Sequence, residues 1–507
     1  MRHAGLMLPL FSATSSRSWG IGELPDVVPL ARWLAQAGFD RLMVLPLGVV
    51  APGDTSPYGA QSSMAIDPMY IAVDAVPDFD RAGGMRRLSA PARADLERAQ
   101  QSDRVDYARV RRVKTEALAL CFEHFYADEW SQLTLRAASL GRFISQERWW
   151  LDDWATYAAV AQAAGAPDWR KWPAPIRDRQ PGAVRDARRQ LAREVLRHQY
   201  LQWIAETQWQ TARRDARALG VTVVGDMPFM VSAASPDVWA RPDEVMLDVS
   251  LGVPPDAFSA TGQDWGLPTY RWDRIAATGF AWMRLRARRM AALYDGYRVD
   301  HLVGLFRTYG RPPIGAPFFN PSEERSQVAQ GETILRILIE SGAAIIAEDL
   351  GVIPPFVRES LARLGVPGCK VMRWERHWDA AGHPFIVSAT YPALSAVMTG
   401  THDTETLAEW WGKEGDLSIP WGDAIRDTLL TAAYRAGSND LFLPLQDVFG
   451  WRDRINIPAT VGDHNWTWRL PWRVDELGDS AVARERAEFC LRAARATDRC
   501  SPEHPST

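Results

Sequence analysis

The chain has 507 residues, of which 47% are apolar, and its formal net charge is -4. This length and apolar content suit a large globular protein, and the charge leaves no basic excess that would attract nucleic acid. No stretch reaches the roughly 18 apolar residues that a membrane-spanning helix needs. The cysteines at positions 121, 369, 490 and 500 show neither a Cys-x-x-Cys pair nor metal-ligand spacing, so we expect reduced thiols and a cytoplasmic location.

Short apolar segments recur along the chain, and each is followed by polar residues and then by a helical pattern. They are LMLPLF (6–11), RLMVLPL (41–47), VTVVGDMP (221–228), GYRVDH (296–301), AAIIAEDL (343–350), CKVMRWE (369–375), SAVMTGTHD (395–403) and LFLPLQD (441–447). Repeated strand and helix units of this kind predict an α/β protein, and eight of them are what a closed (β/α)8 TIM barrel requires. In that fold, active-site groups lie at the C-terminal ends of the strands, where the polar residues occur here.

About 170 residues separate the second and third predicted strands, far more than one helix and two loops need. We therefore expect an insertion over residues 72–215. It is predicted to be mainly helical, because in the segment 109–130 apolar residues follow a three-to-four spacing at Val110, Val113, Ala117, Cys121 and Phe125. Further helices are predicted over 146–165 and 186–220, and their many arginines indicate solvated helix faces.

A second insertion, over residues 229–290, is rich in Pro, Gly, Trp and Asp and is predicted to form long ordered loops over the mouth of the barrel. Residues 501–507 are expected to be a disordered tail. We expect residues 1–500 to form a single barrel domain that includes both insertions.

Acids occur beside other polar groups at the ends of the fourth, fifth and seventh predicted strands. The groups are Arg298, Asp300 and His301; Glu348 and Asp349; and His402, Asp403 and Glu405. Alternate residues of a strand face the same side, so Arg298 and Asp300 point together, and the arginine favours the ionised aspartate that a nucleophile requires. Glu348 follows the apolar run AAIIA, which raises the pKa of a carboxyl as a general acid needs.

One carboxylate kept ionised and one kept protonated form the nucleophile and acid pair of retaining glycoside cleavage. The alternative is that each acid caps the helix after its strand or pairs with a neighbouring arginine. Three acids and two histidines on neighbouring strand ends favour a functional site. Metal binding is a weaker alternative, because the acids lie far apart in sequence and no His-x-x-x-His or EF-hand pattern occurs.

Several longer motifs make the chain recognisable. They are GDTSPYGAQSS, WLDDWA, VVGDMPF, LGVPPDAFSATGQDWGLPTYRWD, YRVDH, IIAEDLG, TGTHDT and INIPATVGDHNWTWRL. With them the chain resembles the 4-α-glucanotransferases, or amylomaltases, of glycoside hydrolase family 77 in the α-amylase superfamily. The resemblance runs from WGIGELPD (19–26) to NWTWRL (465–470), and the motif rich in Pro and Trp marks this family rather than ordinary amylases.

This resemblance implies an enzyme that transfers α-1,4-glucan segments from a donor malto-oligosaccharide to the 4-hydroxyl of an acceptor. It implies that Asp300 is the nucleophile that forms a β-glucosyl intermediate and that Glu348 is the acid/base. Asp403 is then the third carboxylate, which binds sugar hydroxyls and stabilises the oxocarbenium-like state. No metal and no organic cofactor are implied.

The resemblance also implies a set of substrate-binding residues around the three acids. They are Tyr58, Arg298, His301 and His402 at the subsite of the cleaved glucose, Asp256 and Trp265 over the acceptor side, and Asn456, Asn465 and Trp466 after the eighth strand. The partners it implies are α-1,4-glucans, with no nucleic acid and no membrane, and the sequence indicates no particular oligomeric state. An α-glucan hydrolase with the same acids is the alternative activity, and a non-catalytic glucan-binding barrel is a third possibility that the intact acids argue against.

Four places differ from the family pattern. Residues 311–332 stand where many members carry a Gly-Arg-Trp segment, and RWE (373–375) stands where a Gln-Phe pair is common. PAT (458–460) replaces Pro-Gly-Thr, and Ala234 occupies a position where an aspartate is usual. None of these differences includes one of the three acids.

Overall fold

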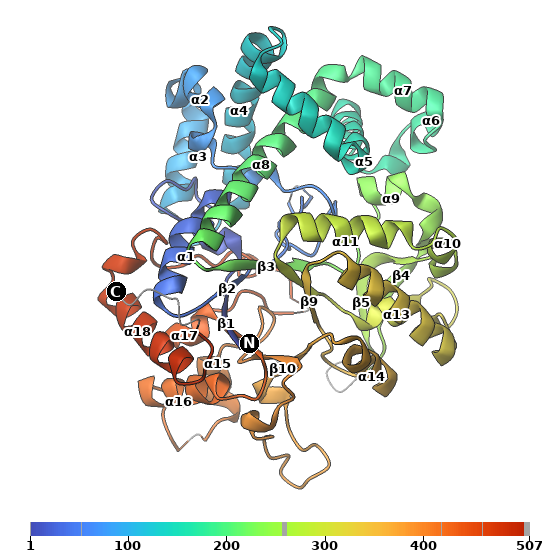
Figure 1. Cartoon of the computed structure of the whole chain (residues 1–507). Coiled ribbons are helices and arrows are strands. Elements are labelled where there is room, and N and C mark those ends of the chain that lie inside the picture. Colours follow the sequence, from blue (N-terminus) through green and yellow to red (C-terminus); the bar gives the residue numbers. More distant parts are fainter. Residues whose placement is uncertain (1, 52, 256–260, 417, 459, 501–507) are drawn as a thin grey trace.

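The computed structural model describes residues 2–51, 53–255, 261–416, 418–458 and 460–500. Its centre is a closed parallel barrel in which the strands follow the order β1-β12-β11-β10-β9-β6-β3-β2 (Figure 1). The barrel strands are β1 (His3–Met7), β2 (Arg41–Met43), β3 (Thr222–Met227), β6 (Gly296–Val299), β9 (Ala344–Ala347), β10 (Gly368–Val371), β11 (Ser395–Met398) and β12 (Asp440–Pro444). The predicted (β/α)8 barrel is confirmed, and all eight apolar segments contribute a strand.

Apolar side chains from the strands fill the interior of the barrel. The set is Met7, Met43, Val224, Ile346, Cys369, Ala396, Met398 and Phe442, all buried. Gly5 makes room for one of the largest, because a Cβ at this position would lie 2.5 Å from the ring of Phe442. The interior is therefore a packed core, and chemistry is confined to the ends of the strands.

The first strand differs from the prediction. The sequence indicated residues 6–11, whereas β1 begins at His3 and ends at Met7, and residues Leu10–Ser12 form a short 3-10 turn. Pro9 lies between the two, and a proline lacks the N–H that a central strand must donate to its neighbour. The strand therefore ends before it.

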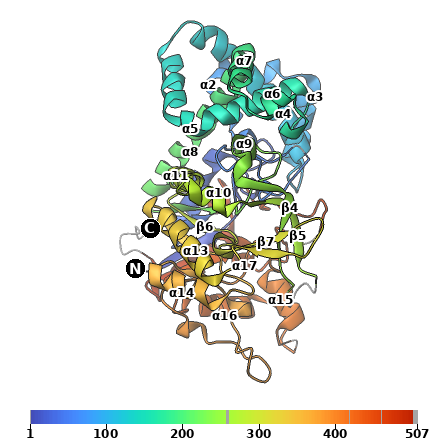
Figure 2. The same cartoon turned by 90° about the vertical axis from the view of Figure 1, so that its right-hand side faces the viewer.

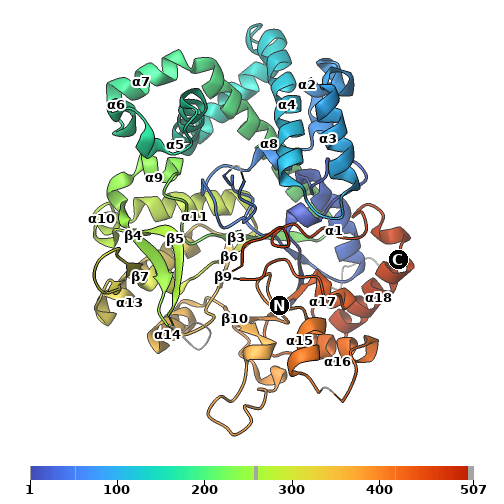
Figure 3. The same cartoon turned by 180° about the vertical axis from the view of Figure 1, so that it is seen from behind.

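Helices cover the outside of the barrel. They are α1 (Val27–Gln36), α8 (Ala192–Ala218), α11 (Ala281–Leu293), α12 (Val303–Phe306), α13 (Glu324–Glu340), α14 (Pro355–Leu364), α15 (Leu407–Glu414), α16 (Asp423–Tyr434), α17 (Leu445–Phe449) and α18 (Ala481–Arg495). Helix α18 packs on α1 beside the first strand, so the end of the described chain closes the ring of helices (Figure 3).

The predicted helical insertion is present between β2 and β3. Besides α8 it contains α2 (Pro77–Arg81), α3 (Ala90–Gln101), α4 (Tyr107–Phe125), α5 (Leu135–Ala164), α6 (Ala174–Arg177) and α7 (Pro181–Gln190). These helices form a lobe to one side of the barrel (Figures 1 and 2). The five apolar residues that predicted α4 are all buried, and the helix predicted over 186–220 is broken at Leu191 into α7 and α8.

A buried ion pair joins this lobe to the barrel. Lys114 of α4 lies 2.5 Å from Glu23, which precedes α1, and both side chains are 2% exposed. The ammonium group of Lys114 also donates to the carbonyls of Met69 and Ile71. Burial raises the pKa of Glu23 to about 8 although Lys114 opposes the shift. The contact places the lobe against the loops that follow β2.

The second insertion is not the set of long loops that its composition predicted. Residues 229–290 contain α9 (Pro236–Ala240), β4 (Val245–Val253), β5 (Gln263–Tyr270), α10 (Trp272–Ala277) and most of α11, and only residues 256–260 lie outside the description. Strands β4 and β5 join β7 (Thr308–Arg311) and β8 (Phe318–Asn320) in an antiparallel sheet of order β5-β4-β7-β8 (Figure 2). Strand β4 pairs with β5 on one side and on the other with β7, which lies beyond β6 in sequence, so composition alone gave no sign of this sheet.

The thiols of Cys121, Cys369 and Cys490 are buried and unpaired. Among the described residues, no helix combines the length and the apolar character that crossing a bilayer requires. The predicted tail 501–507 lies outside the described residues, and the assignment of residues 1–500 to a single domain stays a prediction.

Candidate active site

The candidate residues lie at one end of the barrel, where the parallel strands terminate. Asp226 is in β3, Arg298 is in β6 and Asp300 directly follows that strand, and Glu348 directly follows β9. The register aligns these three strands, because Asp226 pairs with Arg298, and Arg298 pairs with Ile346. The loop after β11 adds His402 and Asp403. Residues that are far apart in sequence therefore share one rim.

Arg298 is the centre of a buried polar network. Its guanidinium group donates to Asp300 Oδ1 at 2.8 Å, to Asp226 Oδ2 at 2.9 Å and to the hydroxyl of Tyr58 at 3.0 Å. The Tyr58 hydroxyl in turn donates to Asp226 Oδ2 at 2.7 Å. Arg298 is 6% exposed, while the Asp300 side chain keeps 25% of its surface. The network holds the cation in place beside Asp300 and leaves part of the Asp300 side chain accessible.

Glu348 is linked to the same strand end through the backbone. The N–H of His301 donates to Glu348 Oε2 at 2.6 Å, and the carbonyl of Glu348 accepts from the N–H of Leu302. Burial raises the pKa of Glu348 to about 8, with Arg298 opposing the shift and Asp300 adding to it. The carboxyl is therefore protonated near neutral pH, which is the state of a general acid.

His301 has an unusual backbone. Its φ of 45° lies in the left-handed region, which is strained for a residue with a side chain. The imidazole packs edge-on against Trp265, with ring centroids 4.7 Å apart, and against Phe229 at 5.5 Å. Burial lowers the pKa of His301 to about 4, with Asp300 opposing the shift, so the ring is neutral and can both donate to and accept from hydroxyls.

Asp403 has its own polar partners. Asn456 Nδ2 donates to Asp403 Oδ1 at 2.6 Å, and His402 Nε2 lies 3.2 Å from Asp403 Oδ2. Burial raises the pKa of this carboxyl, but His402, Asn456 and Arg298 outweigh it and bring the pKa to about 2. The side chain keeps 46% of its surface, so the carboxylate remains accessible despite these partners. It is an ionised carboxylate that faces the opening.

Three rings form an aromatic wall beside these acids. Tyr58 stacks on His402 with centroids 5.2 Å apart and an interplanar angle of 22°. Trp466 lies 5.8 Å from each of them. Flat apolar faces next to polar groups suit the rings of a sugar chain.

One of the predicted binding residues, Asn465, stands apart from this centre. Asn465 uses its side chain within its own loop, where it accepts from the N–H of Ile457 at 2.8 Å and donates to Thr460. It therefore shapes the loop that carries Asn456 and Trp466. Asp256 lies outside the described residues.

Sequence reasoning missed Asp226, which is 2% exposed and bonded to both Arg298 and Tyr58. The signal was present, since Asp226 ends the apolar run VTVVG just as Glu348 ends AAIIA. It also missed Arg454, which donates to the backbone carbonyl of Asp403 at 3.0 Å. Nothing in the sequence around Arg454 distinguishes it from other arginines.

Two further acids at the strand ends have structural partners, as the capping and pairing alternative expected. Asp349 accepts from the N–H of Cys369 at 2.8 Å and so ties β9 to β10. Glu405 forms an ion pair with Lys413 at 3.0 Å. The neighbours Glu348 and Asp349 therefore have different roles.

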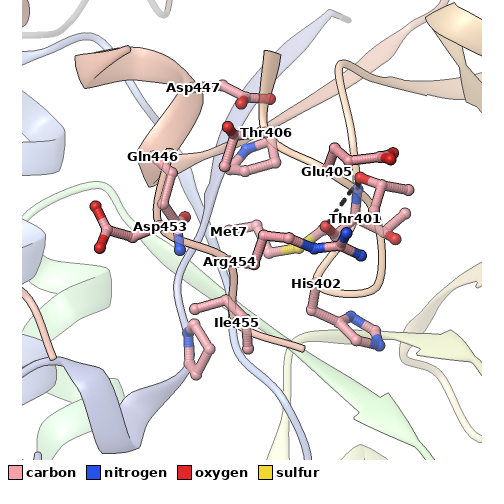
Figure 4. A pocket seen from close by; sticks show the side chains of 13 residues that line it. Met7, Thr401, His402, Glu405, Thr406, Gln446, Asp447, Asp453, Arg454 and Ile455 are labelled. Carbon is pink, nitrogen blue, oxygen red and sulfur yellow. Dashed lines mark hydrogen bonds between the residues drawn. The ribbon is translucent and has the colours of Figure 1, made fainter. Parts of the chain in front are cut away.

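A small cavity of about 20 Å³ lies behind the turn that carries His402 (Figure 4). Residues from β1, from the loop after β11 and from the segment after β12 line it, among them Met7, Thr401, Asp447 and Arg454. Its volume is about that of one buried water molecule. It is too small for a sugar and belongs to the support of the site.

For the glucan transfer that the sequence resemblance implies, we expect Tyr58→Phe to lower kcat/KM about ten- to a hundredfold. The change removes a hydroxyl that bonds Arg298 and Asp226, and hydrogen bonds to charged groups contribute about 1.5 to 3 kcal/mol. Initial rates on a malto-oligosaccharide measure the effect, with circular dichroism as the folding control. A variant with the kcat/KM of the parent protein would show that the hydroxyl does not help to place Arg298.

Comparisons with known proteins agree with this geometry. A family model described as 4-alpha-glucanotransferase matches residues 8–475. The chain is 35% identical over 496 residues to a 4-alpha-glucanotransferase of Thermus thermophilus, an alignment that covers 92% of this chain and 95% of that protein. It is 30% identical over 497 residues to a 4-alpha-glucanotransferase of Chlamydia pneumoniae, with 93% and 92% covered.

Solved structures show the same architecture. An amylomaltase from Streptococcus agalactiae in complex with acarbose superposes with a TM-score of 0.84 at 25% identity, covering 99% of this chain and 100% of that one. An amylomaltase from Corynebacterium glutamicum has the same fold, with a TM-score of 0.79 at 22% identity and with 96% and 75% covered.

Proposed function

Because the chain belongs to the 4-alpha-glucanotransferase family of glycoside hydrolase family 77, we propose that it transfers α-1,4-glucan segments from a donor malto-oligosaccharide to the 4-hydroxyl of an acceptor glucan or glucose by a retaining double displacement. The observation that carries the mechanism is the pair of unlike carboxyls that directly follow β6 and β9. Asp300 is bonded to a buried arginine, and Glu348 has a pKa raised to about 8. Such a pair supplies a nucleophile and an acid at the same pH.

In the first half-reaction, Asp300 attacks the anomeric carbon of the donor while Glu348 protonates the glycosidic oxygen. The bond to the leaving glucan breaks, and a β-linked ester with Asp300 forms. Asp403 is ionised and partly exposed, so it is suited to bind sugar hydroxyls and to stabilise the positive charge that develops on the ring.

The second half-reaction needs Glu348 as a base. Formation of the ester neutralises Asp300, and this removes one of the charges that raise the pKa of Glu348. The proton of Glu348 has left with the first glucan, so the carboxylate can take the proton of an acceptor 4-hydroxyl. That oxygen attacks the anomeric carbon, the bond between this carbon and Asp300 breaks, and an α-1,4 bond is regenerated as the Asp300 carboxylate leaves.

The groups around the acids are proposed to bind the glucan. Tyr58, Arg298, His301 and His402 surround the position next to Asp300, and the stacked rings of Tyr58 and His402 support a sugar face there. Trp265, which belongs to β5, packs edge-on against His301 and is assigned to the acceptor side. Asp256 is proposed for the same side, and Asn456, Asn465 and Trp466 are proposed for the edge of the site after the eighth strand.

The substrates proposed for this protein are malto-oligosaccharides and longer α-1,4-glucans, free in solution. Its proposed location is the cytoplasm. The unpaired buried thiols of Cys121, Cys369 and Cys490 support a reducing compartment, since disulfides are rare there.

Incubation of the purified protein with maltotriose tests the proposal. We expect glucose together with maltopentaose and longer chains, while the total number of reducing ends stays constant, because each transfer breaks one α-1,4 bond and makes another. Chromatography of the products and a reducing-end assay measure both quantities. A rise in reducing ends with glucose and maltose as the only products would make the protein a hydrolase.

A further inference from the structure

Arg373 occupies an unusual place for an arginine. It lies in the short turn Met372–Trp374 that follows β10, the one barrel strand between β9 and β11, and is only 4% exposed. Burial lowers the pKa of Arg373, with Asp447 and Glu405 opposing the shift. A buried guanidinium group must be hydrogen-bonded throughout, so its partners indicate what it does.

Those partners are the two ends of a single turn. Nη2 of Arg373 donates to the carbonyl of Thr399 at 2.9 Å, and Nε donates to the same oxygen at 3.3 Å. Nη1 donates to the carbonyl of Glu405 at 2.8 Å. The segment between these carbonyls contains His402 and Asp403, so one guanidinium group joins the residues on either side of the third carboxylate.

Asp447 of α17 completes this arrangement from the opposite side. It is 1% exposed, accepts from the Thr399 hydroxyl at 2.6 Å and from the N–H of Leu407 at 2.7 Å, and contributes a negative charge that stabilises Arg373. Burial raises the pKa of Asp447 while Arg373 lowers it. The base of the turn is thus held by a buried cation that bonds Thr399 and Glu405 and by a buried acid that bonds Thr399 and Leu407.

Packing alone does not hold this turn. The cavity of about 20 Å³ adjoins it, and Thr401, His402, Thr404 and Glu405 are among its walls (Figure 4). Gly400 leaves no bulk between the turn and the guanidinium group, since a Cβ there would lie 3.1 Å from Arg373 Nη2. The guanidinium group of Arg373 therefore lies directly against the turn, where it donates to the carbonyls of Thr399 and Glu405.

We propose that Arg373 is a positioning residue for glucan transfer, which sets the backbone of the turn 399–405 and so the place of Asp403 and His402 relative to Asp300. The inference rests on the proposed function, in which Asp403 stabilises the charged sugar. Arg373 is expected to affect the transition state, because a displacement of Asp403 weakens the stabilisation of the developing positive charge more than it weakens ground-state binding of the glucan. We therefore expect kcat to depend on Arg373 more than KM does.

Arg373→Lys separates geometry from charge. Lysine keeps the cation beside Asp447, but a single ammonium nitrogen cannot reproduce a planar fork that reaches two carbonyls in different directions. We expect kcat for maltotriose disproportionation to fall at least tenfold, with KM changed less than threefold.

Arg499→Lys is the matched control. Arg499 is likewise buried, and its hydrogen-bond partners among the described residues are backbone carbonyls, including those of His3 and Asn439, at the opposite rim of the barrel where β1 and β12 begin. The Arg499→Lys variant is expected to be less thermally stable than the parent. Its kcat, corrected for the folded fraction measured by circular dichroism, is expected to equal that of the parent. Equal kcat values for the two folded lysine variants would overturn the proposal.

The combination with Asp403→Asn tests whether Arg373 acts through the third carboxylate. With a maltosyl fluoride donor, whose fluoride leaves without protonation, rates of the slow variants can be measured. We expect Arg373→Lys to slow the parent protein at least tenfold and the Asp403→Asn protein less than twofold. Equal factors in the two backgrounds would reduce Arg373 to a general structural role, whereas a parent protein with no transfer activity would refute the proposed function itself.

Discussion

Replacement of Asp300 by asparagine is expected to abolish glucan transfer, with kcat reduced by a factor on the order of 10⁵. The amide is nearly the same size and still accepts a hydrogen bond from Arg298, so the network around that arginine loses little. It cannot form an ester with the anomeric carbon, and without that intermediate neither half-reaction proceeds. Product analysis after prolonged incubation with maltotriose measures the residual rate.

Asp440→Asn is the matched control for this change. Asp440 begins β12 at the opposite rim of the barrel, where it forms an ion pair with Arg41 at 2.7 Å. It is expected to keep the parent kcat. Trapping adds a direct readout: mass spectrometry of protein quenched in acid during turnover of maltosyl fluoride detects a glycosylated peptide that contains Asp300. An adduct on a different carboxyl, or full activity of Asp300→Asn, would refute the assignment of the nucleophile.

Replacement of Glu348 by glutamine is expected to lower kcat on maltotriose by about 10² to 10⁴, the usual contribution of a positioned acid and base. Glutamine keeps an oxygen that can accept from the N–H of His301, so the strand end is preserved. A maltosyl fluoride donor bypasses the need for an acid, and azide bypasses the need for a base. With both present, the variant should recover turnover and release an α-linked maltosyl azide, which distinguishes Glu348 from a residue that only binds sugar.

The raised pKa of Glu348 also predicts a pH dependence. Since the acid must be protonated in the free enzyme, kcat/KM should fall as the pH rises through about 8, and the Gln variant should lack this limb.

The raised pKa of Glu348 also affects the stability of the protein. An acid whose pKa is raised on folding stabilises the protein only while protonated, so the parent loses stability as the pH rises from about 4.5 to about 8. Thermal melts should show that the Tm of the Glu348→Gln variant rises relative to the Tm of the parent as the pH increases across this range.

Much of the fold could be predicted because its signals are local. Each barrel strand is a short apolar run, and five apolar residues at a spacing of three to four predict the helix α4. The predictions failed where a distant partner or one residue decided the outcome. Composition predicted loops where β4 and β5 lie, whereas β4 pairs both with β5 and with β7, which lies beyond β6 in sequence. Strand β1 ends early because of Pro9.

The sequence by itself determined the family and the candidate acids, because parallel strands bring all their C-terminal ends to one rim and so make Asp300, Glu348 and Asp403 neighbours before any coordinates are known. Only the tertiary structure decided how these acids are tuned. Arg298 donates a hydrogen bond to Tyr58, which is 240 positions away in sequence, and Tyr58 in turn donates to Asp226, which is 168 positions away. The pKa of a carboxyl depends on every charge and every buried surface around it, and those neighbours are assembled by packing rather than by order along the chain.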